Sequence, residues 1–201
     1  MKRTKYRLLI TVVVAGASLL MLTVLCRLFW LHPIRIAGRS MELSLKIDDI
    51  VFVNKLSYFV REPKKGDVVF IDTTKLPLKP AARDKRWIKR VVGNPGDRIS
   101  IHPPYVHING DPLNSPEIFA TISERKKGYQ GYLLPDITKH PNSIIKRDTD
   151  EIVLADNEYF LLGDNTSNSH DSRHFGPVPR SAIIGKLSWI IAPSKRRGIV
   201  K

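Results

Sequence analysis

The chain has 201 residues, with 33 Lys or Arg against 19 Asp or Glu, so its formal net charge is +14. A hydrophobic content of 42% supplies a buried core and excludes an intrinsically disordered chain, and the length allows one globular domain plus an anchor. The single cysteine cannot form an internal disulfide, and neither it nor the six histidines show the paired spacing of zinc ligands. We therefore expect neither a metal nor a cofactor.

The chain begins with a basic tail and a long apolar run. Four basic residues come first: Lys2, Arg3, Lys5 and Arg7. Residues 8–26 then carry no charge, which is close to the ~20 residues that span a bilayer. A basic flank favours the cytoplasmic side of a membrane. We therefore expect residues 1–31 to be a cytoplasmic tail and a single-pass anchor in the cytoplasmic (inner) membrane, with the rest of the chain extracytoplasmic and membrane lipid as a partner.

Three other interpretations of this run are a cleaved signal peptide, a lipoprotein signal that ends at Cys26 and a buried core helix. Signal processing needs small side chains near the cut, whereas Leu25 is bulky. The residues therefore favour an uncleaved anchor.

From His32 onward the apolar residues occur in short segments that are rich in β-branched side chains and broken by Gly, Pro and Asp, a pattern typical of strands. Eight strands are predicted, at residues 34–36, 50–54, 68–71, 87–92, 98–101, 106–108, 158–162 and 183–191. Asn109-Gly110 tolerates positive φ at both positions and predicts a tight hairpin. We expect residues 32–201 to form a mainly β domain, an antiparallel β-sheet or barrel-like structure.

Residues 104–150 are polar and rich in turn-forming Pro and Gly, without strong periodicity. We expect this stretch to be an insertion into the β domain, with the basic cluster at residues 125–127 on its surface. The basic residues 195–197 have two interpretations, nucleic-acid binding or a solvated, lipid-facing tail. Because no RNA-binding motif or aromatic stacking platform accompanies them, we expect no nucleic-acid partner.

Ser40 and Lys89 are the candidate catalytic pair. A serine hydroxyl is a weak nucleophile at neutral pH and needs a base within hydrogen-bond reach. Lys89 lies in the apolar run 87–93, a predicted buried strand, and burial lowers the pKa of a lysine. A neutral Lys89 would accept the Ser40 proton and then pass it to the departing amine, acting first as base and then as acid. The alternative is that Lys89 and Arg90 form a solvated charged pair at a strand end.

Three segments carry a specific resemblance: Gly38-Arg39-Ser40-Met41, residues 88–97 and residues 163–173. In this order they resemble the nucleophile box, the lysine box and the C-terminal box of the type I signal peptidases, membrane-bound serine proteases that remove signal peptides from exported proteins. Together with the anchor, the likeness covers most of the chain outside residues 104–150. It implies a Ser40/Lys89 dyad that works through an acyl-enzyme.

The chain departs from the family pattern around Ser40. Leu43-Ser44 stands where a Pro-Thr pair is usual, and Asp48 stands where a glycine is usual, so the resemblance does not fix the geometry of this turn. Gly38 stands where some members have a serine whose hydroxyl helps to bind the oxyanion. The oxyanion is then left to backbone N–H groups, above all that of Ser40 itself.

The C-terminal box is implied to support the dyad. By resemblance, three contacts are expected: Ser169 with the Lys89 amine, Asp164 with Arg90, and Asp171 with Arg173. A hydroxyl orients a neutral lysine without recharging it, whereas a carboxylate would raise the lysine's pKa. A rival within the same residues is a triad of Ser40, His170 and Asp171. Neighbours in an extended segment point to opposite faces, which disfavours that triad.

Six apolar residues flank the proposed dyad and match positions that in the family line shallow pockets for small side chains: Ile34, Ile36, Met41, Leu45, Trp87 and Ile88. Each of these residues is more often part of an ordinary core, and the sequence does not separate the two interpretations. The resemblance implies that the cleavage segment of an exported protein lies as an extended strand beside residues 34–36. It would present alanine-sized side chains one and three places before the cut.

The predicted function is that of a membrane-bound serine endopeptidase whose partners are signal-peptide-bearing preproteins. Two alternatives stay open. One is a conjugation-type pilin-processing peptidase of the same superfamily, and the other is a non-catalytic, membrane-tethered β-domain that binds partners. Self-cleaving DNA-damage repressors share a Ser-Lys dyad but have no membrane span.

Overall fold

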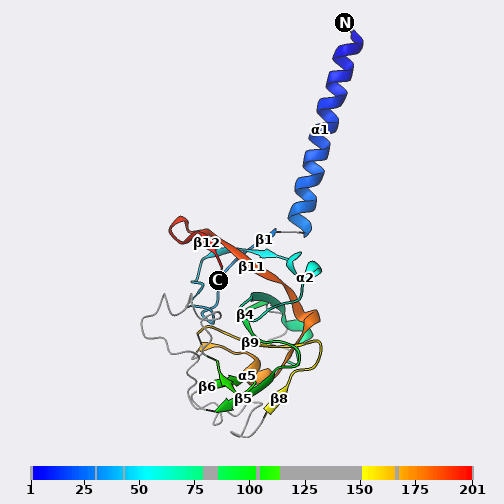
Figure 1. Ribbon diagram of the computed structural model, residues 1–201. Helices are drawn as coiled ribbons and strands as arrows, with labels where there is room; N and C mark the ends of the chain where they lie inside the picture. The colour runs from blue at the N-terminus through cyan, green and yellow to red at the C-terminus, as the bar shows by residue number, and fades with distance from the viewer. Residues whose placement is uncertain are drawn as a thin grey trace.

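The computed structural model describes residues 2–29, 31–42, 44–78, 86–102, 105–113, 151–165 and 168–200. Its first element is helix α1 (Lys2–Phe29), which projects from one end of a β-rich body (Figure 1). The stretch Lys5–Leu25 is 21 residues long and apolar enough to cross a membrane, and none of it is buried against the other described residues. An apolar helix exposed in this way fits the membrane anchor expected here.

Among the described residues, the larger of two sheets has eight strands, all paired antiparallel. In spatial order the path runs through β1 (Leu31–Arg35), β2 (Ile50–Asn54), β11 (Ile183–Ala192), β3 (Val68–Asp72), β4 (Arg86–Gly93), β9 (Glu158–Leu162) and β10 (Val178–Pro179), and β12 (Gly198–Ile199) pairs with β11. Figure 1 shows β1, β12 and the short helix α2 (Ser57–Val60) at the end of the body from which α1 projects. The antiparallel, mainly β class predicted from the sequence is confirmed.

The smaller sheet has four strands in the order β7 (Asp111–Pro112), β6 (Tyr105–Ile108), β5 (Arg98–His102) and β8 (Glu151–Val153). Asn109 and Gly110 have φ of 56° and 90° and connect β6 to β7, with Ile108 paired to Asp111. The predicted hairpin is therefore confirmed. Strands β6 and β7 fall within the stretch expected to be an insertion, whereas its residues 114–150 lie outside the described part of the chain.

Short helical turns complete the described chain: η1 (Thr73–Lys75), α5 (Ser172–Phe175), η4 (Arg180–Ala182) and η5 (Ser194–Arg196). The helix α5 matters most for the site because it begins inside the C-terminal box. Asp171 caps its first turn by accepting a hydrogen bond from the backbone N–H of Arg173.

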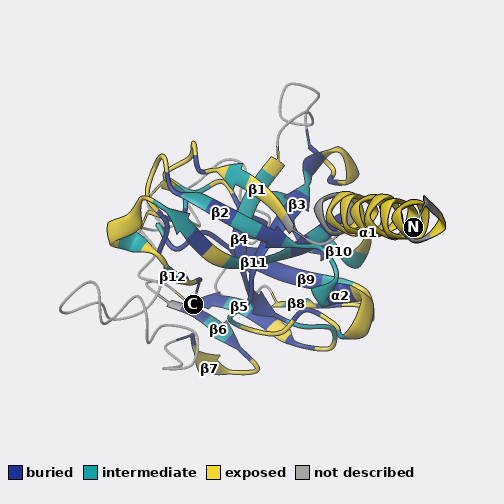
Figure 2. Ribbon diagram, turned by 90° about the horizontal axis from the view of Figure 1, so that it is seen from above, coloured by how far each residue is buried: buried dark blue, intermediate teal, exposed yellow. Residues whose placement is uncertain are grey.

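The centre of the body is formed by β4 and β9, which are covered on both faces. Successive residues point to opposite faces of a strand, and here both faces are apolar. Val91 and Leu161 join one core cluster, while Val92 and Leu162 join another. Figure 2 shows these strands as largely buried, in contrast to the exposed α1. A lysine carried by β4 is therefore placed in the interior.

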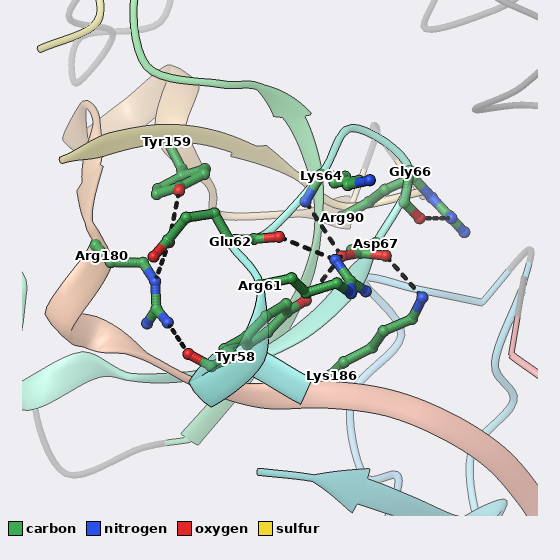
Figure 3. Close-up of polar contacts among 10 residues, drawn as sticks. All are labelled: Tyr58, Arg61, Glu62, Lys64, Gly66, Asp67, Arg90, Tyr159, Arg180 and Lys186. Carbon is green, nitrogen blue, oxygen red and sulfur yellow. Dashed lines mark hydrogen bonds and ion pairs between the residues drawn. The ribbon is translucent and has the colours of Figure 1, made fainter. Parts of the chain in front are cut away.

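A network of polar contacts fastens the loop after α2 to the sheet (Figure 3). Asp67 accepts hydrogen bonds from Arg61 and from the Tyr58 hydroxyl, and it pairs with Lys186 of β11. Although burial raises the pKa of Asp67, the bonds from Arg61 and Lys186 hold this pKa below its usual value. The Gly66 carbonyl accepts a hydrogen bond from Arg90 Nη1 at 2.8 Å, so the network reaches β4 next to Lys89.

Candidate active site

Ser40 lies in a tight turn between β1 and β2. The turn is closed by backbone hydrogen bonds from Glu42 to the Arg39 carbonyl and from Leu45 to the Met41 carbonyl, at 3.1 and 2.7 Å. Met41 and Leu45 are buried in the core cluster that fills this end of the sheet. The two apolar side chains thus anchor the turn and leave Ser40 half-buried at its tip.

Lys89 Nζ and Ser40 Oγ are 2.9 Å apart and form a hydrogen bond. The Lys89 side chain comes from β4 and passes beside Trp87, with Nζ 5.6 Å from the centre of the indole ring. Burial lowers the pKa of Lys89 to about 8; Asp171 and Asp164 oppose this shift, whereas Arg173 adds to it. Because Lys89 and Arg90 are 3% and 1% exposed, the alternative of a solvated charged pair is excluded.

Arg90 pairs with Asp164, as the resemblance implied. Nε and Nη2 of the guanidinium each donate to a different oxygen of the carboxylate at 2.8 Å, and both side chains are buried. The Ser44 hydroxyl completes the group, since it donates to Asp164 and accepts from Arg90 Nη2. Ser44 therefore joins the turn around Ser40 to Arg90 of the lysine box and to Asp164 of the C-terminal box.

Asp171 and Arg173 also pair, through two hydrogen bonds of 2.6 and 2.8 Å. The buried Asp171 carboxylate also accepts a hydrogen bond from the backbone N–H of Gly163, and the Ser172 hydroxyl accepts one from the N–H of Leu161. Burial acts to raise the pKa of Asp171, but Arg173 and these hydrogen bonds hold it below the usual value. The C-terminal box is thus fixed to β9.

Ser169 does not make the hydrogen bond that the resemblance implied. Its Oγ is buried and has no hydrogen-bond partner among the described residues, so the bond to Lys89 is not formed in this structure. Ser169 lies instead against Gly163, where an added Cβ would come within 2.6 Å of the Ser169 Cβ and 2.7 Å of the Ser40 carbonyl oxygen. Only glycine at position 163 allows this approach.

The geometry does not assemble the rival triad. The His170 ring packs edge-on against Trp87 and stacks on His174, with ring centres 5.7 and 4.7 Å apart. The Asp171 carboxylate is held by Arg173 and by the Gly163 N–H rather than by His170. Ser40 therefore has Lys89, and not an imidazole, as its hydrogen-bond donor.

A cavity of about 300 Å³ opens beside the Ser40–Lys89 pair. Five of the six predicted substrate-binding residues line it: Ile34, Ile36, Met41, Trp87 and Ile88. The sixth, Leu45, does not; it is fully buried in the core beneath the end of the sheet.

Sequence reasoning missed Phe70, Arg35 and Arg86, which also line the cavity. Strand pairing places Phe70 opposite Ile88, a register that no local pattern reveals.

Two backbone features bear on oxyanion binding. The Ser40 N–H donates no hydrogen bond within the described part of the chain. Gly38 is exposed, and an added Cβ there would meet nothing within 4 Å.

Sequence reasoning also missed Asn165. Its side-chain Nδ2 donates to the Arg39 carbonyl at 3.1 Å, and its backbone N–H donates to the Ser40 carbonyl at 2.9 Å. No local pattern indicates these contacts, because they join positions more than a hundred residues apart.

Comparison with known sequences gives consistent matches. The family model described as signal peptidase, peptidase S26, matches residues 9–192. A signal peptidase I of Leptolyngbya laminosa is 34% identical over 164 residues, covering 81% of this chain and 70% of that protein. A signal peptidase I of Bacillus caldolyticus is 30% identical over 170 residues, covering 85% and 84%.

A probable signal peptidase I-2 of Synechocystis sp. is 30% identical over 165 residues; the match covers 82% of this chain but only 65% of that relative's length. Among solved structures, a signal peptidase I from Enterococcus faecalis V583 aligns with a TM-score of 0.43 and 23% identity over 64% of this chain and 98% of that one. The family model spans almost the whole chain. The chain therefore belongs to the signal peptidase family, peptidase S26.

Proposed function

We propose that this member of the signal peptidase family removes N-terminal signal peptides from exported preproteins, with Ser40 as nucleophile and Lys89 as general base. The observation that carries the proposal is the 2.9 Å hydrogen bond between Lys89 Nζ and Ser40 Oγ at the wall of an apolar cavity. A buried lysine with a pKa of about 8 is partly neutral at physiological pH, so it has a lone pair for the serine proton.

The reaction follows from this geometry. Neutral Lys89 takes the Ser40 proton as Oγ attacks the scissile carbonyl carbon, and the Ser40 N–H stabilises the oxyanion that forms. The resulting ammonium donates its proton to the leaving amine, which frees the mature protein and leaves an acyl-enzyme on Ser40. Lys89, neutral again, deprotonates the water molecule that attacks the ester, and the ammonium so formed returns this proton to Ser40 Oγ as the signal peptide leaves with a free carboxyl group.

The substrate is proposed to bind as an added strand. Strand β1 lies at one end of the sheet order, so its outer edge has no ladder partner among the described residues. On β4, residues 86–89 pair with β3, but pairing with β9 begins only at Arg90. Both free edges border the cavity, which suits an extended peptide whose alternate small side chains enter the apolar pocket.

The anchor and the orientation belong to the same proposal. Residues 1–31 would form a cytoplasmic tail and a single pass through the cytoplasmic membrane, and residues 32–201 would form the extracytoplasmic peptidase domain. The uncharged run of α1 and the basic residues before it support this arrangement. It would hold the cavity at the membrane surface, where signal peptides emerge.

The test is cleavage of a preprotein by the detergent-solubilised full chain, with the cut mapped by mass spectrometry. We expect one cut after a small residue, abolished in Ser40→Ala and in Lys89→Ala. A serine-reactive probe should label the wild type but not Ser40→Ala. A chain that folds but neither cleaves nor reacts would be a binding module instead, and selective cleavage of a pilin precursor would indicate the conjugation-type peptidase.

A further inference from the structure

The peptide groups on both sides of Ser40 are held by a single residue, Asn165. Its side-chain Nδ2 donates to the Arg39 carbonyl at 3.1 Å, and its backbone N–H donates to the Ser40 carbonyl at 2.9 Å. These contacts join positions that are 126 and 125 residues apart in the chain. Asn165 thus acts on the backbone of the nucleophile rather than on its side chain.

The contact with Arg39 has a consequence for the Ser40 N–H. A trans peptide group is planar, so its C=O and N–H point in opposite directions, and whatever orients one orients the other. The Arg39 carbonyl accepts from both Glu42 N and Asn165 Nδ2, each at 3.1 Å. The opposite end of this peptide group is the Ser40 N–H, which donates to none of the described residues and so is available to a ligand.

The second contact of Asn165, from its backbone N–H, fixes the chain just after Ser40. The Ser40 carbonyl receives the Asn165 N–H, and the neighbouring Gly163 lies so close to this carbonyl that no side chain fits there. With both flanking peptide planes held, the Ser40 N–H has a fixed direction before substrate binds. A preorganised donor stabilises developing negative charge more than one that must reorient during the reaction.

We infer that Asn165 is a positioning residue that aims the Ser40 N–H at the oxyanion of the transition state. The inference rests on the proposed function, because an oxyanion forms only if Ser40 attacks a carbonyl. Hydrogen bonding at the Arg39 carbonyl also polarises the peptide group, which makes the N–H at its other end a stronger donor.

The variants that test this are Asn165→Asp and Asn165→Ala, with Asn168→Asp as the matched control. Asn165→Asp keeps the size and the backbone N–H of the residue but loses the donor to the Arg39 carbonyl. Asn168 is exposed and lies in the same segment, so its change to Asp adds the same charge nearby without touching the Arg39 peptide group. Preprotein cleavage by the full chain in detergent is measured on the pH plateau of each variant.

We expect kcat to fall between about 10- and 100-fold in both Asn165 variants, with KM within about twofold of the wild type, since misdirecting an oxyanion donor weakens only the transition state. A peptide aldehyde, which forms a tetrahedral adduct with Ser40, should lose affinity by a similar factor. The corresponding peptide alcohol should bind unchanged. Asn168→Asp should retain wild-type kcat.

A general structural role would instead lower the affinity for aldehyde and alcohol alike. Equal losses for the two inhibitors, or an unchanged kcat in Asn165→Ala, would overturn the inference. Failure of the wild type to cleave any preprotein would refute the proposed function. This outcome differs from a failure of the inference, which concerns only the ratio of kcat between variant and wild type.

Discussion

At the scale of single residues, the proposed mechanism makes the pH range of activity depend on the pKa of Lys89. Burial lowers this pKa to about 8, and only the neutral amine can accept the Ser40 proton. Below pH 8 the ammonium dominates, so we expect kcat/KM to fall about tenfold per pH unit as the pH drops, and to level off above pH 9. The measurement is cleavage rate against pH, on a peptide without titratable groups near the cut.

The controls for this profile separate the lysine from the nearby imidazoles. Lys89→Arg should be inactive at every pH, because arginine does not lose its proton in a protein. His170→Ala should leave the midpoint near 8, since its ring packs on Trp87 and His174. A midpoint near ~6.5 that vanishes in His170→Ala would instead identify histidine as the base.

Gly163 is a second residue on which the site depends. A Cβ at this position would lie 2.7 Å from the Ser40 carbonyl oxygen, a backbone atom that cannot move without displacing the nucleophile. We expect Gly163→Ala to lower kcat by about 100-fold or more, because small misplacements of reacting groups are costly. Gly198→Ala is the control, since nothing lies within 4 Å of its added Cβ. Comparable activity in both variants would contradict the close approach.

Gly38 has the opposite character, because its surroundings are open. An added Cβ would meet nothing within 4 Å, so Gly38→Ser can be accommodated. Its hydroxyl would stand two residues before the nucleophile, where it could offer a second donor to the oxyanion. We expect kcat to rise in Gly38→Ser and to stay unchanged in Gly38→Ala, measured on the same preprotein. An unchanged kcat in Gly38→Ser would mean that the hydroxyl does not reach the oxyanion.

At the scale of elements, the buried pair of Arg90 and Asp164 joins β4 to the loop after β9. Removing one partner leaves an unpaired charge in the interior, so we expect Asp164→Ala to lower the free energy of unfolding by about 3 to 5 kcal/mol. The exposed Arg98–Glu151 pair is the control, and Glu151→Ala should cost less than about 1 kcal/mol. Urea unfolding in detergent measures both, and equal costs would contradict the assigned burial.

Local patterns predicted the elements that bury apolar residues regularly. The run around Lys89 and the segment before Gly163 became β4 and β9, because both are apolar on both faces. Strands β7, β10 and β12 are two residues long, and β8 is three, so they depend on partners rather than on their own sequence. Such elements are not readable from local periodicity.

The residues of the candidate site also differ in whether the sequence could predict them. Lys89 could be predicted because a lysine in an apolar run is conspicuous, whereas Ser40 and the two ion pairs were expected from the resemblance of three segments to the family. Phe70 and Asn165 could not, because their roles arise from strand register and from contacts across more than a hundred residues. Leu45 was assigned to the pocket because neighbours in a turn look alike in sequence, although of these two turn residues Met41 lines the cavity and Leu45 does not.

At the scale of the whole molecule, the orientation of α1 determines on which side of the membrane the domain lies. The basic residues before the helix favour a cytoplasmic N-terminus. Trypsin added to intact spheroplasts should then cut at residues 125–127, a basic cluster outside the described part of the chain. Protection of this cluster until the membrane is lysed would reverse the proposed topology.

The junction of α1 and β1 bears on the proposed site of cleavage. Helix α1 ends at Phe29 and β1 begins at Leu31, so eleven residues lead from the helix end to Ser40, and they reach at most about 40 Å when extended. If α1 is anchored in the bilayer as proposed, Ser40 lies within that distance of the membrane. The proposal then implies that the distance of the scissile bond from the membrane selects the cleavage position, together with side-chain size.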